Sequence, residues 1–144
     1  MTQIKFVVPG VPVAKGRPKF RKVGKFVQAY TPAKTHKAEK FIADCFKRQI
    51  ETVPTEYEHI GMTCNFYMPF PKGTSKKRQN EWHEIKFHVK RPDLDNLIKT
   101  ICDALNGIAF ADDSAVTHMD VCKLYSKEPR TEVYLHYYKK DLTN

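Results

Sequence analysis

The alternation and helical spacing of apolar residues divide the chain into six predicted strands and two main helices. The strands are expected over residues 4–8, 26–29, 60–68, 85–90, 115–125 and 131–138. In the clearest of these segments, Ile60, Met62 and Cys64 recur at every second position, which is the period of a strand with one buried face. These strands are expected to supply a mixed sheet.

Two longer segments repeat their apolar residues at the three- and four-residue spacing of a helix. The first runs from about residue 35 to residue 50, and the second from residue 94 to residue 105. Asn106 and Gly107 follow the second segment and are typical of a helix end. The polar, basic insert at 73–84 is expected to form a short helix of its own.

The connections complete the predicted topology. Residues 15–25 (KGRPKFRKVGK) are expected to form a basic loop, because glycine and proline punctuate them. The turn at 127–130 is expected to join the last two strands as a hairpin. Strand, helix and strand over 85–125 suggest a right-handed crossover. The predicted class is α+β, a mixed sheet with two main helices in a single domain spanning residues 1–144.

Composition places the chain among globular proteins. It has 144 residues, of which 41% are hydrophobic and 28% charged, the size of one ordinary domain. No apolar stretch approaches the roughly 20 residues that a membrane span needs, and the N-terminus lacks the apolar centre of a signal peptide. The four cysteines form no Cys-x-x-Cys pair, which favours buried free thiols in a reducing compartment. We therefore expect a cytoplasmic protein with no membrane partner.

The distribution of charge along the chain says more about function than the overall composition does. The formal net charge is +9, which favours a polyanionic partner. Residues 1–50 carry 12 Lys or Arg against two acids, whereas residues 91–120 carry six aspartates against two cations. Such an arrangement is expected of a nuclease, in which basic groups neutralise phosphates and clustered carboxylates hold a divalent cation.

Asp93 and Asp95 stand at the start of the second long helix, as its N-cap and about its second residue. Free backbone N–H groups and the helix dipole favour carboxylates there, so capping explains the two when they are taken alone. Taken alone, Asp112 and Asp113 would likewise be explained as residues of a turn. Lys99 lies one turn after Asp95 on the same face, where it forms either an exposed ion pair or part of a site.

A loop that returns beside the start of this helix would add a third carboxylate, from Asp112 or Asp113, to the first two. Mg²⁺ is held by a few carboxylates together with waters and phosphate oxygens. Three close carboxylates without a cation would repel one another. The residues alone therefore suggest a hard-cation site, with Lys99 placed to orient a water or stabilise developing charge.

Ordered blocks of sequence resemble the RusA-type Holliday junction resolvases. The blocks are Arg91-Pro-Asp-Leu-Asp-Asn-Leu-Ile-Lys99, then Asp103-Ala-Leu-Asn-Gly107, then Asp112-Asp-Ser114 before a strand. Weaker support comes from Pro12-Val-Ala-Lys-Gly-Arg-Pro18 and Tyr30-Thr-Pro32, which are similar to the N-terminal region of many phage-type members. Asp-x-Asp alone has little specificity, whereas these blocks in this order over residues 90–125 are a specific match.

The resemblance implies a RusA-like fold and a homodimer that binds branched DNA. Such a dimer would nick two strands of a four-way junction symmetrically, with Mg²⁺ or Mn²⁺ and no small-molecule cofactor, and would be bacterial or phage-encoded. Matched position by position, Asp93, Asp95 and Asp113 are the implied metal ligands, and Lys99 is the implied further catalytic residue. Asp112 matches the first member of the aspartate pair, and no role is transferred to the long 68–86 segment.

Basic groups interleaved with aromatic residues are expected to hold the DNA. The 15–25 loop carries six cations and Phe20, which is expected to stack on unstacked bases or insert beside them. The candidate DNA-contacting residues are Lys15, Arg17, Lys19, Phe20, Arg21, Lys76, Lys77, Arg91 and Asn96. A solvated loop with ordinary aromatic residues is the alternative.

Two other functions are compatible with the same residues. A Mg²⁺ nuclease that acts on flaps or replication forks needs the same metal chemistry. A non-catalytic DNA-binding dimer would use its aspartates as helix caps and would show salt-sensitive binding without turnover. Cleavage of junction, flap and duplex substrates, with Asp95→Asn alongside, separates these functions.

Overall fold

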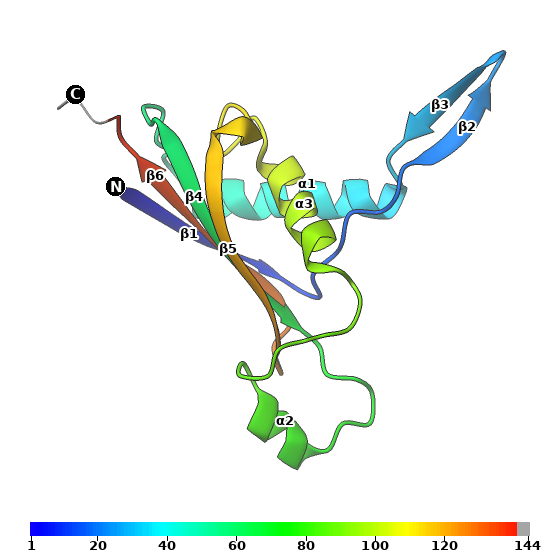
Figure 1. Cartoon of the computed structure of the whole chain (residues 1–144), viewed down its shortest axis with the longest axis vertical. Helices are drawn as coiled ribbons and strands as arrows, with labels where there is room; N and C mark the ends of the chain where they lie inside the picture. Colours follow the sequence, from blue (N-terminus) through cyan, green and yellow to red (C-terminus); the bar gives the residue numbers. More distant parts are fainter. Residues whose placement is uncertain (141–144) are drawn as a thin grey trace.

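The computed structural model describes residues 1–140, and its main sheet has four strands in the order β1-β6-β4-β5 (Figure 1). They are β1 (Thr2–Pro9), β4 (His59–Met68), β5 (Val116–Tyr125) and β6 (Arg130–Tyr138). β6 runs antiparallel to β1 and β4, whereas β4 and β5 are parallel. The predicted α+β class with a mixed sheet is therefore confirmed. Residues 141–144, which the single-domain prediction includes, lie outside the described residues.

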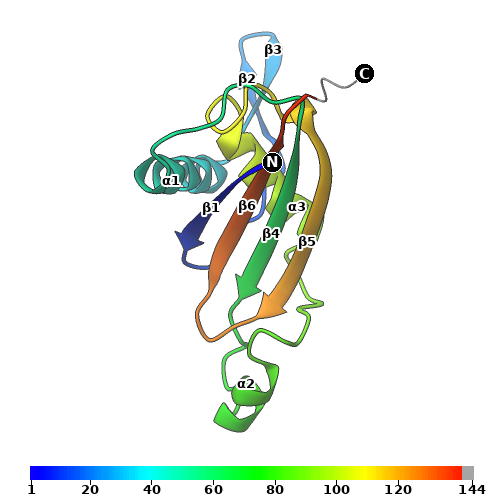
Figure 2. The same cartoon turned by 90° about the vertical axis from the view of Figure 1, so that its left-hand side faces the viewer.

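Three helices accompany the sheet: α1 (Ala33–Gln49), the short α2 (Lys76–Trp82) and α3 (Leu94–Leu105). The long helices α1 and α3 lie on one face of the sheet, and Figure 2 looks onto the other face, which they leave open. Phe6 of β1 and Phe46 of α1 meet edge to face at 5.1 Å between ring centroids. Leu97 and Leu105 of α3 are fully buried, so the core fixes the position of this helix on the sheet.

The predicted hairpin between the last two strands is wrong, because β4 lies between β5 and β6. The connection from β5 to β6 passes over the end of β4, where the backbone N–H of Ser126 donates to the Met68 carbonyl at 2.9 Å. The physical reason is burial. Ile60 and Cys64 of β4 are entirely buried, which favours a central place for β4, while much of β5 is exposed and forms an edge.

The basic loop predicted at 15–25 is partly a strand. β2 (Lys19–Val23) pairs antiparallel with β3 (Phe26–Tyr30), and the hairpin extends away from the body of the protein (Figure 1). Gly24 adopts a positive φ of 60° in the tight turn between them, a conformation that favours glycine. Every residue of both strands is exposed, so no alternation of buried positions marked the first strand in the sequence.

The strand predicted at 85–90 is reduced to a single bridge between Phe87 and Leu124. The segment still lies beside the end of β5, since His88 N–H donates to the Lys123 carbonyl at 2.9 Å. The strand that precedes α3 in the parallel crossover is therefore β4, with the α2 segment inserted between them. Arg130 fastens this insertion to β6 through an ion pair of 2.9 Å with Glu84.

All four cysteines are free, and three of them are buried, as the sequence predicted. No helix of residues 1–140 is long and apolar enough to cross a membrane.

Candidate active site

Asp93 and Asp95 occupy the positions at the start of α3 that the sequence predicted. Asp93 is the N-cap residue, and its carbonyl accepts the Leu97 N–H at 3.2 Å. Its side chain makes no capping hydrogen bond, so the carboxylate is not used for the structural role that would have explained it. Asp95 lies in the first turn and is exposed. Both carboxylates are available to a ligand.

Lys99 and Asn96 lie on the same helix but differ in their surroundings. Lys99 is exposed on the outer side of α3 and forms no ion pair within residues 1–140. The Asn96 carbonyl accepts the Lys15 N–H at 2.9 Å and the Thr100 hydroxyl at 3.2 Å. The backbone of Asn96 thus ties the N-terminal basic segment to the start of α3, while its side chain lines a depression next to Asp93.

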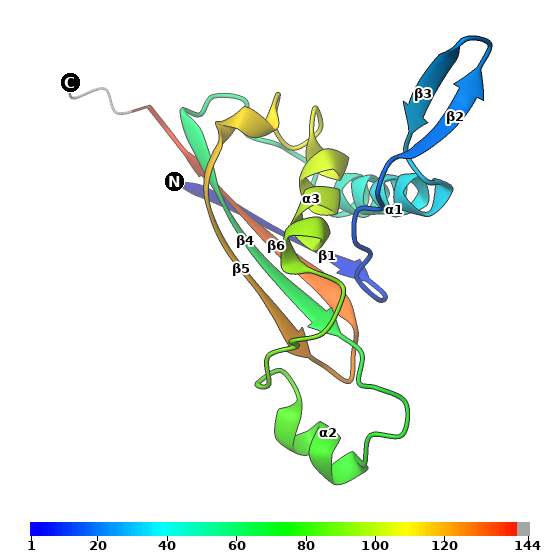
Figure 3. The ribbon, with the colours of Figure 1, turned by 45° about the vertical axis from the view of Figure 1, so that its right-hand side comes forward.

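Asp113 lies at the other end of α3, which differs from the expectation that its loop returns beside Asp93. It begins the 3-10 turn η1 (Asp113–Ala115), and its N–H donates to Oδ1 of Asn106, the C-cap residue of α3, at 2.9 Å. In Figure 3 the connection after α3 leads directly to the start of β5 beside this end of the helix. Burial raises the pKa of Cys102, in the last turn of α3, to about 11, and the negative charge of Asp113 adds to the effect.

Asp112 has a structural role in the same turn. Its carboxylate accepts the Ser114 hydroxyl at 2.6 Å, and this hydrogen bond lowers the pKa of Asp112. Asp113 makes its hydrogen bond through the backbone and keeps an exposed side chain. The two members of the pair therefore differ, and Asp113 has the freer carboxylate.

The donor set fits a hard cation only in part. Two exposed carboxylates at a helix start suit Mg²⁺, which takes one or two carboxylates together with waters and phosphate oxygens. Across residues 1–140, however, no three side chains of His, Cys, Asp or Glu gather closely enough to hold one ion. Asp93, Asp95 and Asp113 therefore do not form a three-carboxylate site within one chain.

A basic cleft opens next to Asp93. It runs between the N-terminal segment and the stretch before α3, and its lining includes Lys15, Lys19, Lys34 and Arg91 but no acidic residue. Arg91 and Pro92 also line the neighbouring depression, where Arg17, Asp93 and Asn96 meet. The carboxylate of Asp93 thus stands where a cation-lined surface ends, an arrangement suited to a phosphate backbone passing a metal.

Lys15 differs from the other predicted DNA contacts. Its ammonium lies 2.8 Å from the Glu39 carboxylate of α1 and 2.9 Å from the Asp103 carboxylate of α3. The Asp103-Ala-Leu block, for which the sequence suggested no role, thereby holds the N-terminal segment against both helices. The ammonium of Lys15 is occupied by these two acids.

Two basic arms extend from the body of the protein, the β2–β3 hairpin and the α2 insertion (Figure 1). The lining of the cleft includes Lys19 of the hairpin and Pro69, which precedes the insertion. Lys19, Phe20 and Arg21 are exposed on the hairpin, and the Phe20 side chain is 68% exposed. Lys76 and Lys77 are exposed on α2. The arms therefore present the cations and the aromatic side chain that the sequence predicted as DNA contacts.

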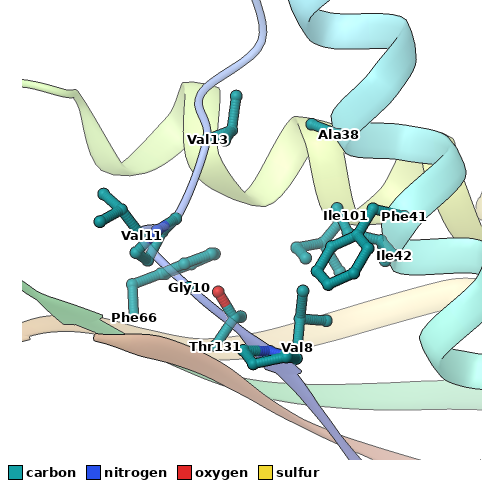
Figure 4. A pocket seen from close by; sticks show the side chains of 12 residues that line it. Val8, Gly10, Val11, Val13, Ala38, Phe41, Ile42, Phe66, Ile101 and Thr131 are labelled. Atoms are coloured by element: carbon teal, nitrogen blue, oxygen red, sulfur yellow. The ribbon is translucent and has the colours of Figure 1, made fainter. Parts of the chain in front are cut away.

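A second, apolar cavity lies between the end of β1 and helices α1 and α3 (Figure 4). Its volume is about 50 Å³, and Thr131 is the one polar side chain among the residues that line it. A cavity without ionisable groups offers no acid, base or metal ligand.

Comparison with known proteins identifies the family of the chain. The family model for the endodeoxyribonuclease RusA matches residues 9–136, which include both basic arms and all of α3. The chain is also 36% identical over 139 residues to the uncharacterized protein YqaN of Bacillus subtilis (strain 168), a match covering 94% of this chain and 96% of that protein. The chain therefore belongs to the RusA endodeoxyribonuclease family.

Proposed function

We propose that this protein is a Mg²⁺-dependent endonuclease that resolves four-way DNA junctions by symmetric paired nicks. Family membership supports the class of reaction. The observation that carries the proposal is the position of Asp93 and Asp95 at the start of α3. Asp93 makes no capping hydrogen bond, neither carboxylate has an ion-pair partner in the described chain, and Asp93 lines the depression that adjoins the basic cleft.

Each residue near the start of α3 has a proposed task. When bound, Mg²⁺ supplies an acidified water and neutralises charge on the phosphate, and Mn²⁺ would substitute for it. Asp93 and Asp95 would hold the ion. The protonated ammonium of Lys99, one turn along the same helix, would donate hydrogen bonds to the attacking water or to a phosphate oxygen. Arg17 and Arg91 would bind the neighbouring phosphates.

The shape of the basic surface supports a branched substrate. The hairpin and the α2 insertion extend from the body of the protein in different directions, so one arm of a branched DNA would contact each (Figure 1). Phe20 on the hairpin would stack on bases exposed where the strands part. Binding by such cations falls steeply with salt, because each phosphate contact releases condensed counterions.

A homodimer is proposed because two symmetric cuts require two sites. An exposed apolar stripe supports an intermolecular contact. Ile85, Phe87 and Val89 alternate along the segment beside β5, and their side chains are 74%, 62% and 84% exposed. Three exposed apolar side chains at alternate positions of one segment are uncommon on a surface that contacts only water.

The test is cleavage of a synthetic four-way junction with and without Mg²⁺. Asp93→Asn and Asp95→Asn should each abolish cleavage while junction binding, followed by gel retardation, persists. Asp44→Asn is the matched control, since Asp44 is an exposed aspartate on α1. Full Mg²⁺-dependent cleavage by both α3 variants would overturn the assignment.

The same assay separates the other functions. Flap, fork and plain duplex substrates run under single-turnover conditions show whether the four-way junction is preferred. A protein that binds DNA but cuts none of these with Mg²⁺ or Mn²⁺ is a binding module. The missing side-chain cap at Asp93 gives that alternative no support.

A further inference from the structure

The basic cleft beside Asp93 has apolar walls, which the binding of phosphates does not explain. Residues 11–14 (VPVA) form part of one wall, and Met68, Pro69 and Pro92 form part of the other. The volume of the cleft is about 680 Å³, within the range of about 300–1,000 Å³ that is usual for ligand pockets. Concave sites with such walls bind ligands that have an apolar body and a few polar groups. A nucleic-acid base has this character.

The exposure of the lining residues separates the floor of the cleft from its mouth. Met68 is 2% exposed and His88 is 9% exposed, so these two side chains lie deep. Lys19, Lys34 and Arg91 are exposed, so the cations surround the mouth. A nucleotide has the matching division, because its charge is on the phosphate and its base is neutral and flat.

His88 supplies a polar group on this floor. Its ring packs edge to face on Tyr125, with 4.9 Å between the ring centroids. Nδ1 is buried without a hydrogen-bond partner in residues 1–140, so Nε2 is the nitrogen that a ligand in the cleft can reach. Burial, and then the charge of Lys123, lowers the pKa of His88, so the ring is neutral at pH 7. A neutral imidazole suits the edge of a base, which also carries no charge.

Both walls are held in place before any ligand arrives. The Lys123 ammonium donates to the carbonyls of Lys90 and Pro92, each at 2.7 Å. Across the cleft, the Gly16 N–H donates to Oγ1 of Thr35 at 3.0 Å. A Cβ atom at Gly16 would lie 2.9 Å from this oxygen, so glycine allows the wall to approach α1 closely. A preformed site loses less conformational entropy when it binds.

We propose that the cleft receives one unpaired nucleotide of the DNA junction, turned out of the base stack. The base lies between residues 11–14 and Met68, and one of its edges is hydrogen-bonded to His88. The phosphates on either side of it meet the cations at the mouth. This inference rests on the proposed function, since it concerns the branched DNA that the same surface binds.

The position of the cleft links this nucleotide to the cleavage point. Arg91 and Pro92 line both the cleft and the depression where Asp93 lies, so the extruded nucleotide adjoins the proposed metal site. Turning a base out of an intact duplex requires unpairing and unstacking, and this cost is lower where the strands already part. The cleft therefore favours a branch point over plain duplex, a preference that phosphate contacts alone do not provide.

Junctions that carry 2-aminopurine test the inference without cleavage, because the fluorescence of this base rises when it leaves the stack. The Asp95→Asn protein is used so that the DNA stays intact, and the reporter is placed in turn at each nucleotide beside the branch point. Binding should raise the fluorescence severalfold at one position and should leave a plain duplex unchanged. A mismatched pair at the same position should also tighten binding severalfold, because it lowers the cost of unpairing.

Variants made in the Asp95→Asn protein separate the cleft from general DNA binding. Ala14→Phe fills the cleft and should abolish the fluorescence rise, whereas Ala43→Phe is its control, half-buried on α1 outside the lining. His88→Leu removes one neutral hydrogen bond and should weaken junction binding about threefold to tenfold. His88→Gln should restore most of this loss, since its amide takes the place of Nε2. His36→Gln on the exposed face of α1 should have no effect.

The inference is overturned by a protein that binds the junction while the reporter stays dark at every position and the mismatch brings no gain. That is the result expected of a cleft crossed only by a duplex backbone. It is also overturned if Ala14→Phe keeps the full rise, or if His88→Leu binds as tightly as its parent.

The nicking assay with wild-type protein distinguishes these failures from a failure of the proposed function. A wild-type protein that raises the fluorescence but never cuts junctions with Mg²⁺ would overturn the proposed endonuclease and leave the nucleotide site standing. A wild-type protein that cuts junctions, with a dark reporter and no gain from the mismatch, would overturn the nucleotide site alone.

Discussion

Replacing Lys15 with methionine should destabilise the fold without removing a DNA contact. The ammonium bridges Glu39 of α1 and Asp103 of α3 at 2.8 and 2.9 Å. Burial lowers the pKa of Lys15, but its hydrogen bonds to the two carboxylates outweigh this, so the net pKa is raised above 10.5. A raised lysine pKa means that the stabilisation is complete at neutral pH. It is lost only as the pH rises past 10.5 through the folded-state pKa.

The magnitude follows from the degree of burial. Exposed ion pairs contribute about 0.2–1 kcal/mol, and breaking a buried pair costs about 3–5 kcal/mol. The side chains of Lys15 and Glu39 are about 20% exposed and that of Asp103 is 33% exposed, so the bridge lies between these limits. Methionine keeps most of the apolar stem and leaves two carboxylates without their cation. We expect a loss of about 1–3 kcal/mol in the free energy of unfolding.

Urea unfolding followed by circular dichroism measures this loss as a lower midpoint at unchanged slope. Lys19→Met is the control, since Lys19 is exposed on the hairpin. The control should change stability by less than about 0.5 kcal/mol and reduce the salt dependence of junction binding by about one phosphate contact. The reasoning would be refuted if Lys15→Met kept wild-type stability and lowered the slope of log affinity against log salt. Lys15 would then be a DNA contact, as the sequence predicted.

Three further predictions concern the cleft and the helix beside it. Arg17→Gln should weaken junction binding and lower the slope of log affinity against log salt by about one in titrations at several salt concentrations, and an unchanged slope would contradict its phosphate contact. Leu97→Ala should lower the free energy of unfolding in urea by about 2–5 kcal/mol, because the Leu97 side chain is fully buried beneath α3. A loss below about 1 kcal/mol would show that the core collapses into the cavity left by the substitution. His88 titrates: burial, and then the charge of Lys123, lowers its pKa below 6.5, so stability falls as the pH drops from 6.5 toward the folded-state pKa. His88→Phe should reduce the difference in melting temperature between pH 7.5 and pH 5.5, and an unchanged difference would place the titration elsewhere.

Much of the fold could be predicted from local pattern. The buried stripe of α3 and the alternation in β4 are periodic signals, and both elements appear within a residue or two of their predicted bounds. The hairpin of β2 and β3 was half missed, because exposed strands such as Lys19–Val23 carry no buried period. The order of the strands was missed as well. The sequence of the short connection between β5 and β6 is the same whether these strands pair with each other or β4 lies between them.

The sequence by itself indicated which residues are candidates for the chemistry. The carboxylates at the start of α3, the basic segments and the ordered family blocks are all readable along the chain, since each depends on residue type and short spacing. That the Asp93 carboxylate caps no helix N–H group is known only from the structure. Tertiary structure decided where Asp113 lies. The connection after α3 leads into β5, whose parallel pairing with β4 places its first residue at the far end of the helix from Asp93. Sequence spacing reports how many residues separate two aspartates, but the direction in which the chain returns is set by strand pairing and burial. That direction sets Asp113 apart from Asp93 within one chain.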